Sequence, residues 1–168
     1  MPGAPRLGFV SGSILSFTRD YDLPVEIVWD ALVDPDLVIG WLADATIDAR
    51  EGGVYDLEWI GPTYLANTRG EIELLEPLER LRIATSNIGL LEFTLEILEG
   101  GTRGGATRLG VRIVSDVEPR FSANISAHWL TNLDQLEDLL RGRPVDWANW
   151  ERDRGSAWNA HFEEVVRN

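Results

Sequence analysis

The spacing of hydrophobic residues along the chain changes from a helical period to a strand period. Residues 13–21 are predicted as a first strand, and Pro24 opens a segment whose apolar positions lie three and four residues apart, as on one face of a helix. Asp34 and Pro35 end this helix and begin a shorter one, because proline disfavours helical backbone in the residue before it. The pattern therefore predicts one strand followed by two short helices.

From residue 43 onward, apolar and polar residues alternate, which is the period of a half-buried strand. Short turns separate the alternating stretches. Consecutive strands of this kind pair antiparallel and bury one face of the resulting sheet. The predicted strands after the helices lie at residues 43–50, 54–60, 69–75, 80–86, 91–97 and 107–113.

The longest helical pattern comes last and ends at Gly142 and Pro144. A strand meander followed by one long helix buries both apolar faces most simply when the sheet curls around the helix. We therefore predict an α+β fold in which a curved antiparallel sheet of about seven strands wraps around a long C-terminal helix, with two short helices after the first strand. The apolar stripe of that helix consists of Ile125, Trp129, Leu133, Leu136 and Leu140.

Several short motifs occur in a characteristic order and spacing, and together they extend over nearly all of residues 13–142. They are PVEIVWDAL at 24–32, GW at 40–41, DAREGG at 48–53, GEI at 70–72, EPLERL at 76–81 and GATRL at 105–109. The ordered set resembles a START-like (SRPBCC, helix-grip) domain, in the subfamily of homologues of the heat-shock-chaperone ATPase activator. The resemblance implies the helix-grip fold. Members of this superfamily bind lipids, hormones or polyketides, catalyse cyclisation, or act with chaperones, so the fold alone does not identify the function.

The pattern divides the chain into three parts. Residues 1–12 contain two prolines and three glycines and are expected to be a flexible N-terminal tail. Residues 13–142 are the START-like helix-grip domain. Residues 143–168 form a C-terminal extension rich in aromatic residues, and aromatic surface of this extent is seldom left in solvent. We expect this extension to be helical and to pack on the domain or on the partner in a homodimer.

The composition excludes several functions. A net charge of −13 argues against nucleic acid as a partner, since a basic face is the usual footprint of such binding. Without cysteine or lysine, the chain has no thiolate nucleophile, no cysteine-ligated metal and no Schiff base. The exclusive use of arginine as the basic residue indicates a GC-rich bacterial source. No apolar run is long enough for a membrane span or a signal peptide, so we expect a cytoplasmic protein without integral membrane association.

Aromatic residues on the predicted inner face are candidates for a ligand pocket between the sheet and the long helix. Trp41 lies where the second short helix passes into a strand, at the expected pocket mouth, and a structural role there is the alternative to ligand contact. Tyr55 and Trp59 point inward from a central strand, where lining a pocket and packing the core are equally expected. Phe93 and Trp129 face the same interior from another strand and from the long helix.

Polar residues near this interior could bind the head of a ligand. Tyr64, Asn67 and Arg69 surround the turn at residues 61–62 and offer a phenol, an amide and a guanidinium. The alternative for Arg69 is a solvent-facing side chain paired with a strand glutamate. His128 would face the cavity from the flank of the apolar stripe.

Neither a catalytic residue set nor a metal or cofactor site is predicted. His128 and His161 lie far apart in the sequence and lack the accompanying carboxylates of a metal site. The sequence contains no nucleophile elbow, phosphate loop or dinucleotide fingerprint, and the glycine-rich stretch at 100–105 is typical of a hairpin. We therefore expect no cofactor.

Three functions are compatible with these observations. Binding of a hydrophobic or amphipathic small molecule, lipid-like or polyketide-like, ranks first because the inner face is apolar with few polar anchors. A cyclase- or aromatase-like enzyme ranks second, because it needs an acid or base in the pocket and only His128, Arg69 and Tyr64 could supply one. A chaperone-associated protein ranks third, because the co-chaperones of the family carry a further N-terminal domain for which this chain leaves no room.

Overall fold

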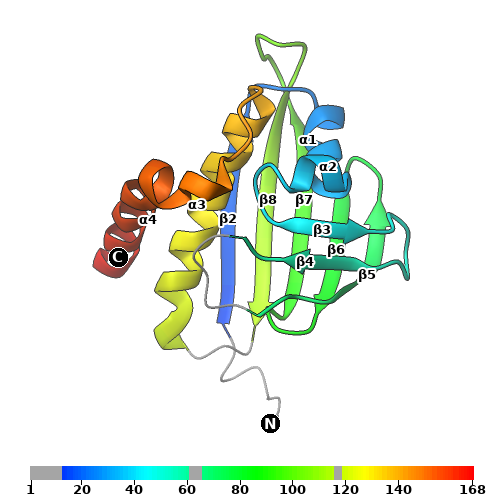
Figure 1. Ribbon diagram of the computed structural model, residues 1–168. Coiled ribbons are helices and arrows are strands. Elements are labelled where there is room, and N and C mark those ends of the chain that lie inside the picture. Colours follow the sequence, from blue (N-terminus) through cyan, green and yellow to red (C-terminus); the bar gives the residue numbers. More distant parts are fainter. Residues whose placement is uncertain (1–12, 61–65, 116–118) are drawn as a thin grey trace.

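The computed structural model describes residues 13–60, 66–115 and 119–168 and confirms the predicted α+β helix-grip architecture (Figure 1). The expected tail at residues 1–12 lies outside the described residues. The helices are α1 (Val25–Val33), α2 (Pro35–Val38), α3 (Ser122–Leu140) and α4 (Trp150–Arg167). The strands are β2 (Ser13–Tyr21), β3 (Asp44–Ile47), β4 (Tyr55–Glu58), β5 (Gly70–Glu76), β6 (Arg80–Thr85), β7 (Leu90–Leu98) and β8 (Ala106–Ser115).

The strands form two antiparallel groups. The larger sheet has the order β2-β8-β7-β6-β5, and β3 and β4 form a separate pair that runs across the direction of the longer strands (Figure 1). The two groups meet where Leu57 and Thr68 exchange backbone hydrogen bonds of 2.8 and 2.9 Å and where Val54 bridges to Glu71. The predicted sheet of about seven strands is therefore present in the described residues, with irregular pairing between β4 and β5.

The predicted strand at residues 43–50 is shorter in the structure, where β3 ends at Ile47. The chain turns immediately afterwards, because the backbone N–H of Arg50 donates to the Asp48 carbonyl at 2.8 Å and that of Gly53 donates to the Arg50 carbonyl at 2.9 Å. These local hydrogen bonds replace the ladder bonds that a longer strand would need.

The two short helices follow the sequence signals closely. Pro35 occupies the first turn of α2, where its missing N–H costs no hydrogen bond. The Asp34 side chain accepts a hydrogen bond from the backbone N–H of Asp36 at 3.0 Å, so it caps the second helix directly after the first ends.

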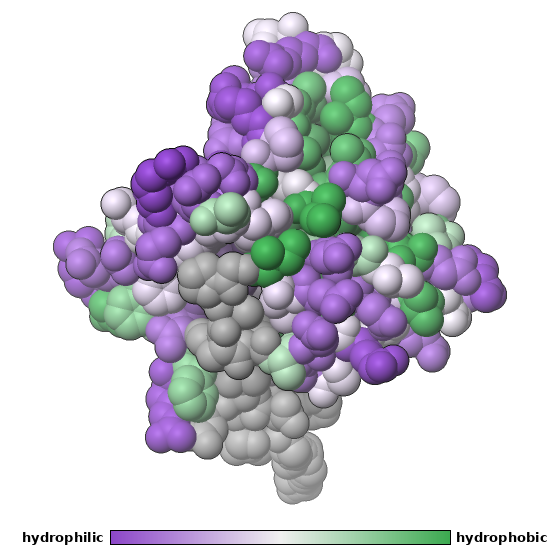
Figure 2. All heavy atoms as spheres, viewed as in Figure 1, coloured by the Kyte–Doolittle hydropathy of each residue, from purple (hydrophilic) through white to green (hydrophobic). Residues whose placement is uncertain are grey.

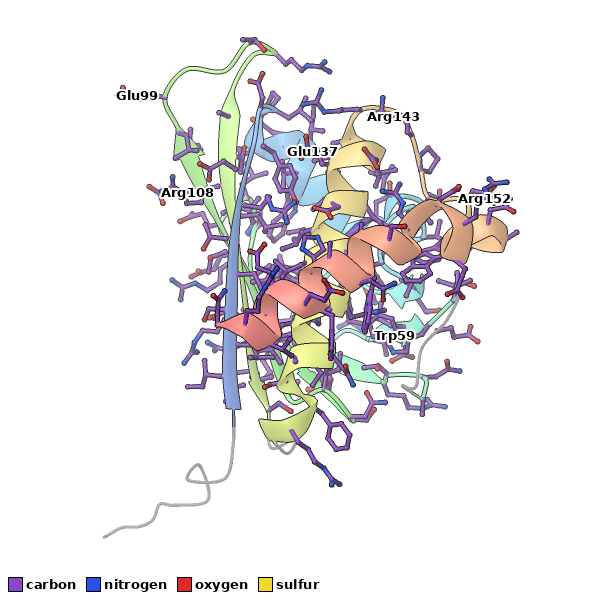
Figure 3. All side chains as sticks on the ribbon, turned by 90° about the vertical axis from the view of Figure 1, so that its left-hand side faces the viewer. Trp59, Glu99, Arg108, Glu137, Arg143 and Arg152 are labelled. Carbon is purple, nitrogen blue, oxygen red and sulfur yellow. The ribbon has the colours of Figure 1, made fainter. Side chains whose placement is uncertain are left out.

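The hydrophobic core lies between the larger sheet and α3. Figures 1 and 3 show α3 and the β3–β4 pair on the same side of that sheet. The Tyr21 hydroxyl in β2 donates to the Leu133 carbonyl of α3 at 2.9 Å, which fixes the helix against the edge strand. The largest fully buried side chains of the core include Trp41, Tyr55, Phe93 and Trp129.

Helix α4 packs on α3 and crosses in front of it in the view of Figure 3, with its C-terminal end toward β2. The Asp134 carboxylate on α3 lies 2.7 Å from Arg19 Nη1 of β2 and 2.7 Å from His161 Nε2 of α4, so one side chain connects three elements. One turn further along α3, Asp138 pairs with Arg154 of α4 at 2.7 Å. These partly buried pairs set the position of α4 along α3.

Hydrophilic residues are prominent on one face of the molecule (Figure 2). On the face shown in Figure 2, hydrophilic side chains separate smaller groups of hydrophobic ones. The exposed large hydrophobic residues come from different elements and loops, among them Ile27, Ile39 and Val54. Among the described residues, no helix is both long and apolar enough to cross a lipid bilayer.

We expect the junction between β4 and β5 to tolerate no side chain at Gly70. A Cβ atom there would lie 2.4 Å from the Tyr55 carbonyl oxygen and 2.8 Å from Ile83 Cγ2. The Gly70→Ala variant should lower the free energy of unfolding in urea by about 2 kcal/mol, because the backbone must shift to accommodate it.

Gly155→Ala is the matched control, because the added Cβ lies on α4 with its nearest neighbour at 3.9 Å. This variant should gain about 0.5–1 kcal/mol from the higher helix propensity of alanine. Equal stability of the Gly70→Ala variant and the wild type would contradict the close packing at the junction.

Candidate ligand-binding site

One flank of α3 carries polar side chains into the interior of the protein. His128, Asn132 and Gln135 lie four and three residues apart, so they share one side of the helix, next to the apolar stripe. Asn132 is 2% exposed and Gln135 is fully buried. Buried polar side chains on a core-facing helix are uncommon and need hydrogen-bond partners.

Two atoms of this flank have no such partner. His128 Nε2 and Asn132 Nδ2 are both buried and make no hydrogen bond within the described part of the chain. An unpartnered polar atom in the interior costs about 1–3 kcal/mol. Their placement one helical turn apart makes them the candidate contacts for a polar group of a ligand.

Trp59, directly after β4, forms one side of the site, and Thr68 and Asn87 fix its position. The rings of Trp59 and His128 meet edge to face, with centroids 5.9 Å apart and an interplanar angle of 72°. Trp59 Nε1 donates to Thr68 Oγ1 at 2.9 Å, and the Thr68 hydroxyl donates to Asn87 Oδ1 at 2.6 Å. Asn87 Nδ2 donates in turn to the Ala66 carbonyl at 2.8 Å. This chain of hydrogen bonds fixes the Trp59 ring beside His128; Trp59 is labelled in Figure 3.

Burial lowers the pKa of His128 to about 4, from an ordinary value of 6.5, because the apolar surroundings disfavour the charged ring. The imidazole is therefore neutral at pH 7. A neutral imidazole has one ring nitrogen that donates and one that accepts a hydrogen bond. The site thus offers polarity without a positive charge from this histidine.

Four of the predicted pocket residues are packed within the core. Trp41 Nε1 donates to the Ala31 carbonyl at 2.8 Å, and the Tyr55 hydroxyl donates to the Leu32 carbonyl at 2.7 Å. Burial also raises the pKa of Tyr55 well above its usual range. The polar atoms of both residues are thus occupied by backbone carbonyls. The remaining two, Phe93 and Trp129, pack against each other with ring centroids 6.3 Å apart.

Two of the three polar residues predicted around the turn before β5 lie at the surface. Tyr64 is outside the described residues. Asn67 and Arg69 are exposed, and the backbone N–H of Arg69 donates to Ser86 Oγ at 3.0 Å. The structure thus brings Trp59 and His128 together and leaves Asn67 and Arg69 at the surface.

Asn132 and Gln135 were not among the residues predicted for the site. A signal for them is present, because their spacing from His128 repeats the spacing of the neighbouring apolar stripe. Polar residues that follow the period of a buried stripe indicate a polar lining rather than a solvated face. Clusters of three or more residues able to hold a metal ion do not occur within the described ranges.

Residues 22–141 match the family described as Activator of Hsp90 ATPase homolog 1-like protein. A comparison with curated proteins yields no match. Among solved structures, CalU16 from Micromonospora echinospora is 28% identical with a TM-score of 0.61, and the match covers 89% of this chain and 88% of that chain.

DynU16, described as a protein in the dynemicin biosynthetic locus, is 25% identical with a TM-score of 0.64. That match covers 80% of this chain and 50% of the DynU16 chain. MLL2253 from Mesorhizobium loti shares the fold, with 19% identity and a TM-score of 0.66 over 79% of this chain and 100% of that one. Because the family match takes in most of the chain, and the solved structures share its fold, the chain belongs to the Activator of Hsp90 ATPase homolog 1-like family of the START-like superfamily.

Proposed function

We propose that this protein binds a hydrophobic or amphipathic small molecule, lipid-like or polyketide-like, between the sheet and α3. The observation that carries the proposal is the pair of buried, unpartnered atoms His128 Nε2 and Asn132 Nδ2. A ligand whose polar group bonds to these atoms would offset the cost of burying them, since buried polar groups in proteins are normally hydrogen-bonded. Such pockets are commonly apolar with a few polar groups that orient the ligand.

Hydrophobic surface for the rest of the ligand lies beside these atoms. Trp59 and Ile125 pack against the core but are only partly buried. Trp59 contacts the His128 ring, and Ile125 lies three residues before His128 on α3, so both flank the polar pair. An apolar ligand body that covers them would contribute about 25 cal/mol for each Å² removed from water.

The comparisons support a ligand of this class. CalU16 and DynU16 share the fold with this chain at 28% and 25% identity, and DynU16 is assigned to the dynemicin biosynthetic locus. The membership of a relative in a biosynthetic locus supports a small molecule as the ligand of this site.

A cyclase-like enzyme is the second candidate, and His128 is the observation that favours it. A neutral, buried imidazole beside a ligand site could accept a proton from a bound substrate. A pKa of about 4 makes His128 a weak base at neutral pH, and Arg69 is exposed, so binding without catalysis ranks first. The chaperone-associated role has the family name as its sole support.

Native mass spectrometry of the purified protein should show a small-molecule adduct that denaturing conditions release. The double variant His128→Leu, Asn132→Leu should lose the adduct, because it removes both polar contacts. The same double variant should also be more stable than the unliganded wild type by about 1 kcal/mol or more, since it removes two unpartnered polar atoms from the interior. The same spectra report the number of subunits and so test the expected homodimer.

Thr131→Val is the control for this experiment. Its hydroxyl is buried on the same helix and donates to the Ala127 carbonyl at 2.8 Å, away from the unpartnered pair. This variant should keep the adduct. An adduct that survives in the double variant, or a wild-type protein that binds none, would contradict the proposed function.

The pH dependence of stability should report the burial of His128. Its pKa is about 4 in the folded protein and 6.5 as the ordinary value, so the unfolded chain binds an additional proton between these pH values. The contribution is fully present above pH 6.5 and is lost as the pH falls towards 4. The wild type should therefore lose up to about 3 kcal/mol more than His128→Gln across this range.

Urea unfolding at several pH values between 7 and 4 measures this difference directly. Titrating carboxylates affect both proteins in the same way and cancel in the comparison. Parallel stability curves for the wild type and His128→Gln would show that the imidazole is not buried in its neutral form.

A further inference from the structure

A chain of buried hydrogen bonds runs from α4 to the unpartnered side of Asn132. Trp150 Nε1, at the start of α4, donates to Gln135 Oε1 at 2.8 Å. Gln135 Nε2 donates to the Trp41 carbonyl at 2.7 Å and to Asn132 Oδ1 at 3.3 Å. Trp150, Gln135 and Asn132 are 7%, 0% and 2% exposed, so water does not compete for these groups.

The chemistry of the two ends determines how each amide is oriented. An indole N–H can only donate a hydrogen bond, and a backbone carbonyl can only accept one. The Gln135 amide must therefore turn its oxygen to Trp150 and its nitrogen to Trp41. Its nitrogen then donates to Asn132, which must offer its oxygen in return. The Asn132 NH₂ group is left on the unpartnered side.

We infer that Trp150 acts through Gln135 as a positioning residue that holds Asn132 as a hydrogen-bond donor, and that the site therefore selects ligands presenting a neutral acceptor oxygen, such as a ketone or ester carbonyl. This inference rests on the proposed ligand-binding function. A ligand without an acceptor would leave the Asn132 NH₂ group unpartnered, and this loss is the usual basis of discrimination between analogues that differ by one polar group.

The uncharged state of His128 favours a ligand group that carries no charge. His128 lies one helical turn from Asn132 and is uncharged at pH 7, because burial lowers its pKa to about 4. A carboxylate at this position would lose its hydration without gaining a cation from His128, which is costly in a buried site. The pair therefore favours a neutral carbonyl over the carboxylate of a fatty acid.

The positioning residue belongs to an element outside the part of the chain that matches the family. The match ends at residue 141, and α4 begins at Trp150. Helix α4 lies against α3 (Figure 3). Pairs that join His161 to Asp134 and Arg154 to Asp138 hold it there, so the Trp150 indole keeps its place.

The test uses three probes with the same naphthalene body: methyl 2-naphthyl ketone, 2-ethylnaphthalene and 2-naphthoate. Calorimetric titration at pH 7 should show the ketone bound about tenfold more tightly than the hydrocarbon, which is the value of roughly one hydrogen bond. The carboxylate should bind more weakly than the ketone. The carbonyl stretch of the bound ketone should move to lower frequency than in a hydrocarbon solvent.

Trp150→Phe removes the indole N–H and keeps an aromatic ring. It should reduce the affinity for the ketone by about twofold to fivefold, because the Trp41 carbonyl still binds the Gln135 nitrogen, and leave the affinity for 2-ethylnaphthalene unchanged. Trp147→Phe is the matched control, because Trp147 Nε1 donates at 2.7 Å to the Ile39 carbonyl, outside this chain of hydrogen bonds. The control should keep the wild-type preference for the ketone. If Trp150→Phe does not fold, Gln135→Met interrupts the same chain and should show the same loss.

Side-chain amide resonances of Asn132, recorded without ligand, provide a readout independent of the probes. They should shift in Trp150→Phe and stay in place in Trp147→Phe. Equal binding of ketone and hydrocarbon to the wild type would overturn the inference and leave the proposed function standing. If none of the probes binds the wild type, the proposed function fails, and unshifted Asn132 resonances in Trp150→Phe would then overturn the positioning role as well.

Discussion

The way in which the elements meet in the interior depends on the side-chain amide of Gln135. This amide is fully buried and has to make all its hydrogen bonds within the protein. Its partners come from three places: the Trp41 carbonyl after α2, the Asn132 side chain on α3 and the Trp150 indole of α4. The Trp41 carbonyl can only accept a hydrogen bond and the Trp150 indole can only donate one. The Gln135 nitrogen then requires the oxygen of the Asn132 amide. The meeting of these elements is therefore specified by hydrogen-bond polarity as well as by shape.

Helix α3 has two adjacent faces with different roles. Its apolar stripe, which includes Trp129 and Leu136, packs into the core and stabilises the fold. The flank formed by His128, Asn132 and Gln135 instead places polar atoms where apolar ones would stabilise the fold more. A cost in stability at one face of the central helix is the expected sign of a binding site, because proteins retain unpartnered buried groups where function needs them.

Periodicity predicted the fold well, because strands and helices with one buried face repeat apolar residues at fixed intervals. It also placed His128 beside the stripe and Trp59 at the end of an inward-facing strand, and the two rings meet in the structure. It missed Asn132 and Gln135, because the atoms that satisfy Gln135 come from a carbonyl 94 residues away and from an indole 15 residues away. The spacing of Asn132 and Gln135 from His128 does follow the apolar stripe, but the atoms that satisfy their hydrogen bonds depend on tertiary placement.

The attachment of α4 has a consequence for how such proteins diversify. The Trp150 indole of this helix reaches the polar flank, and partly exposed ion pairs at Asp134 and Asp138 join the helix to α3. Substitutions at Trp150 in this outer helix can therefore change the hydrogen bonding of the inner amides, while the sheet and α3 keep their own sequence. Under the proposed function, ligand preference can change between homologues that keep the same sheet and the same α3.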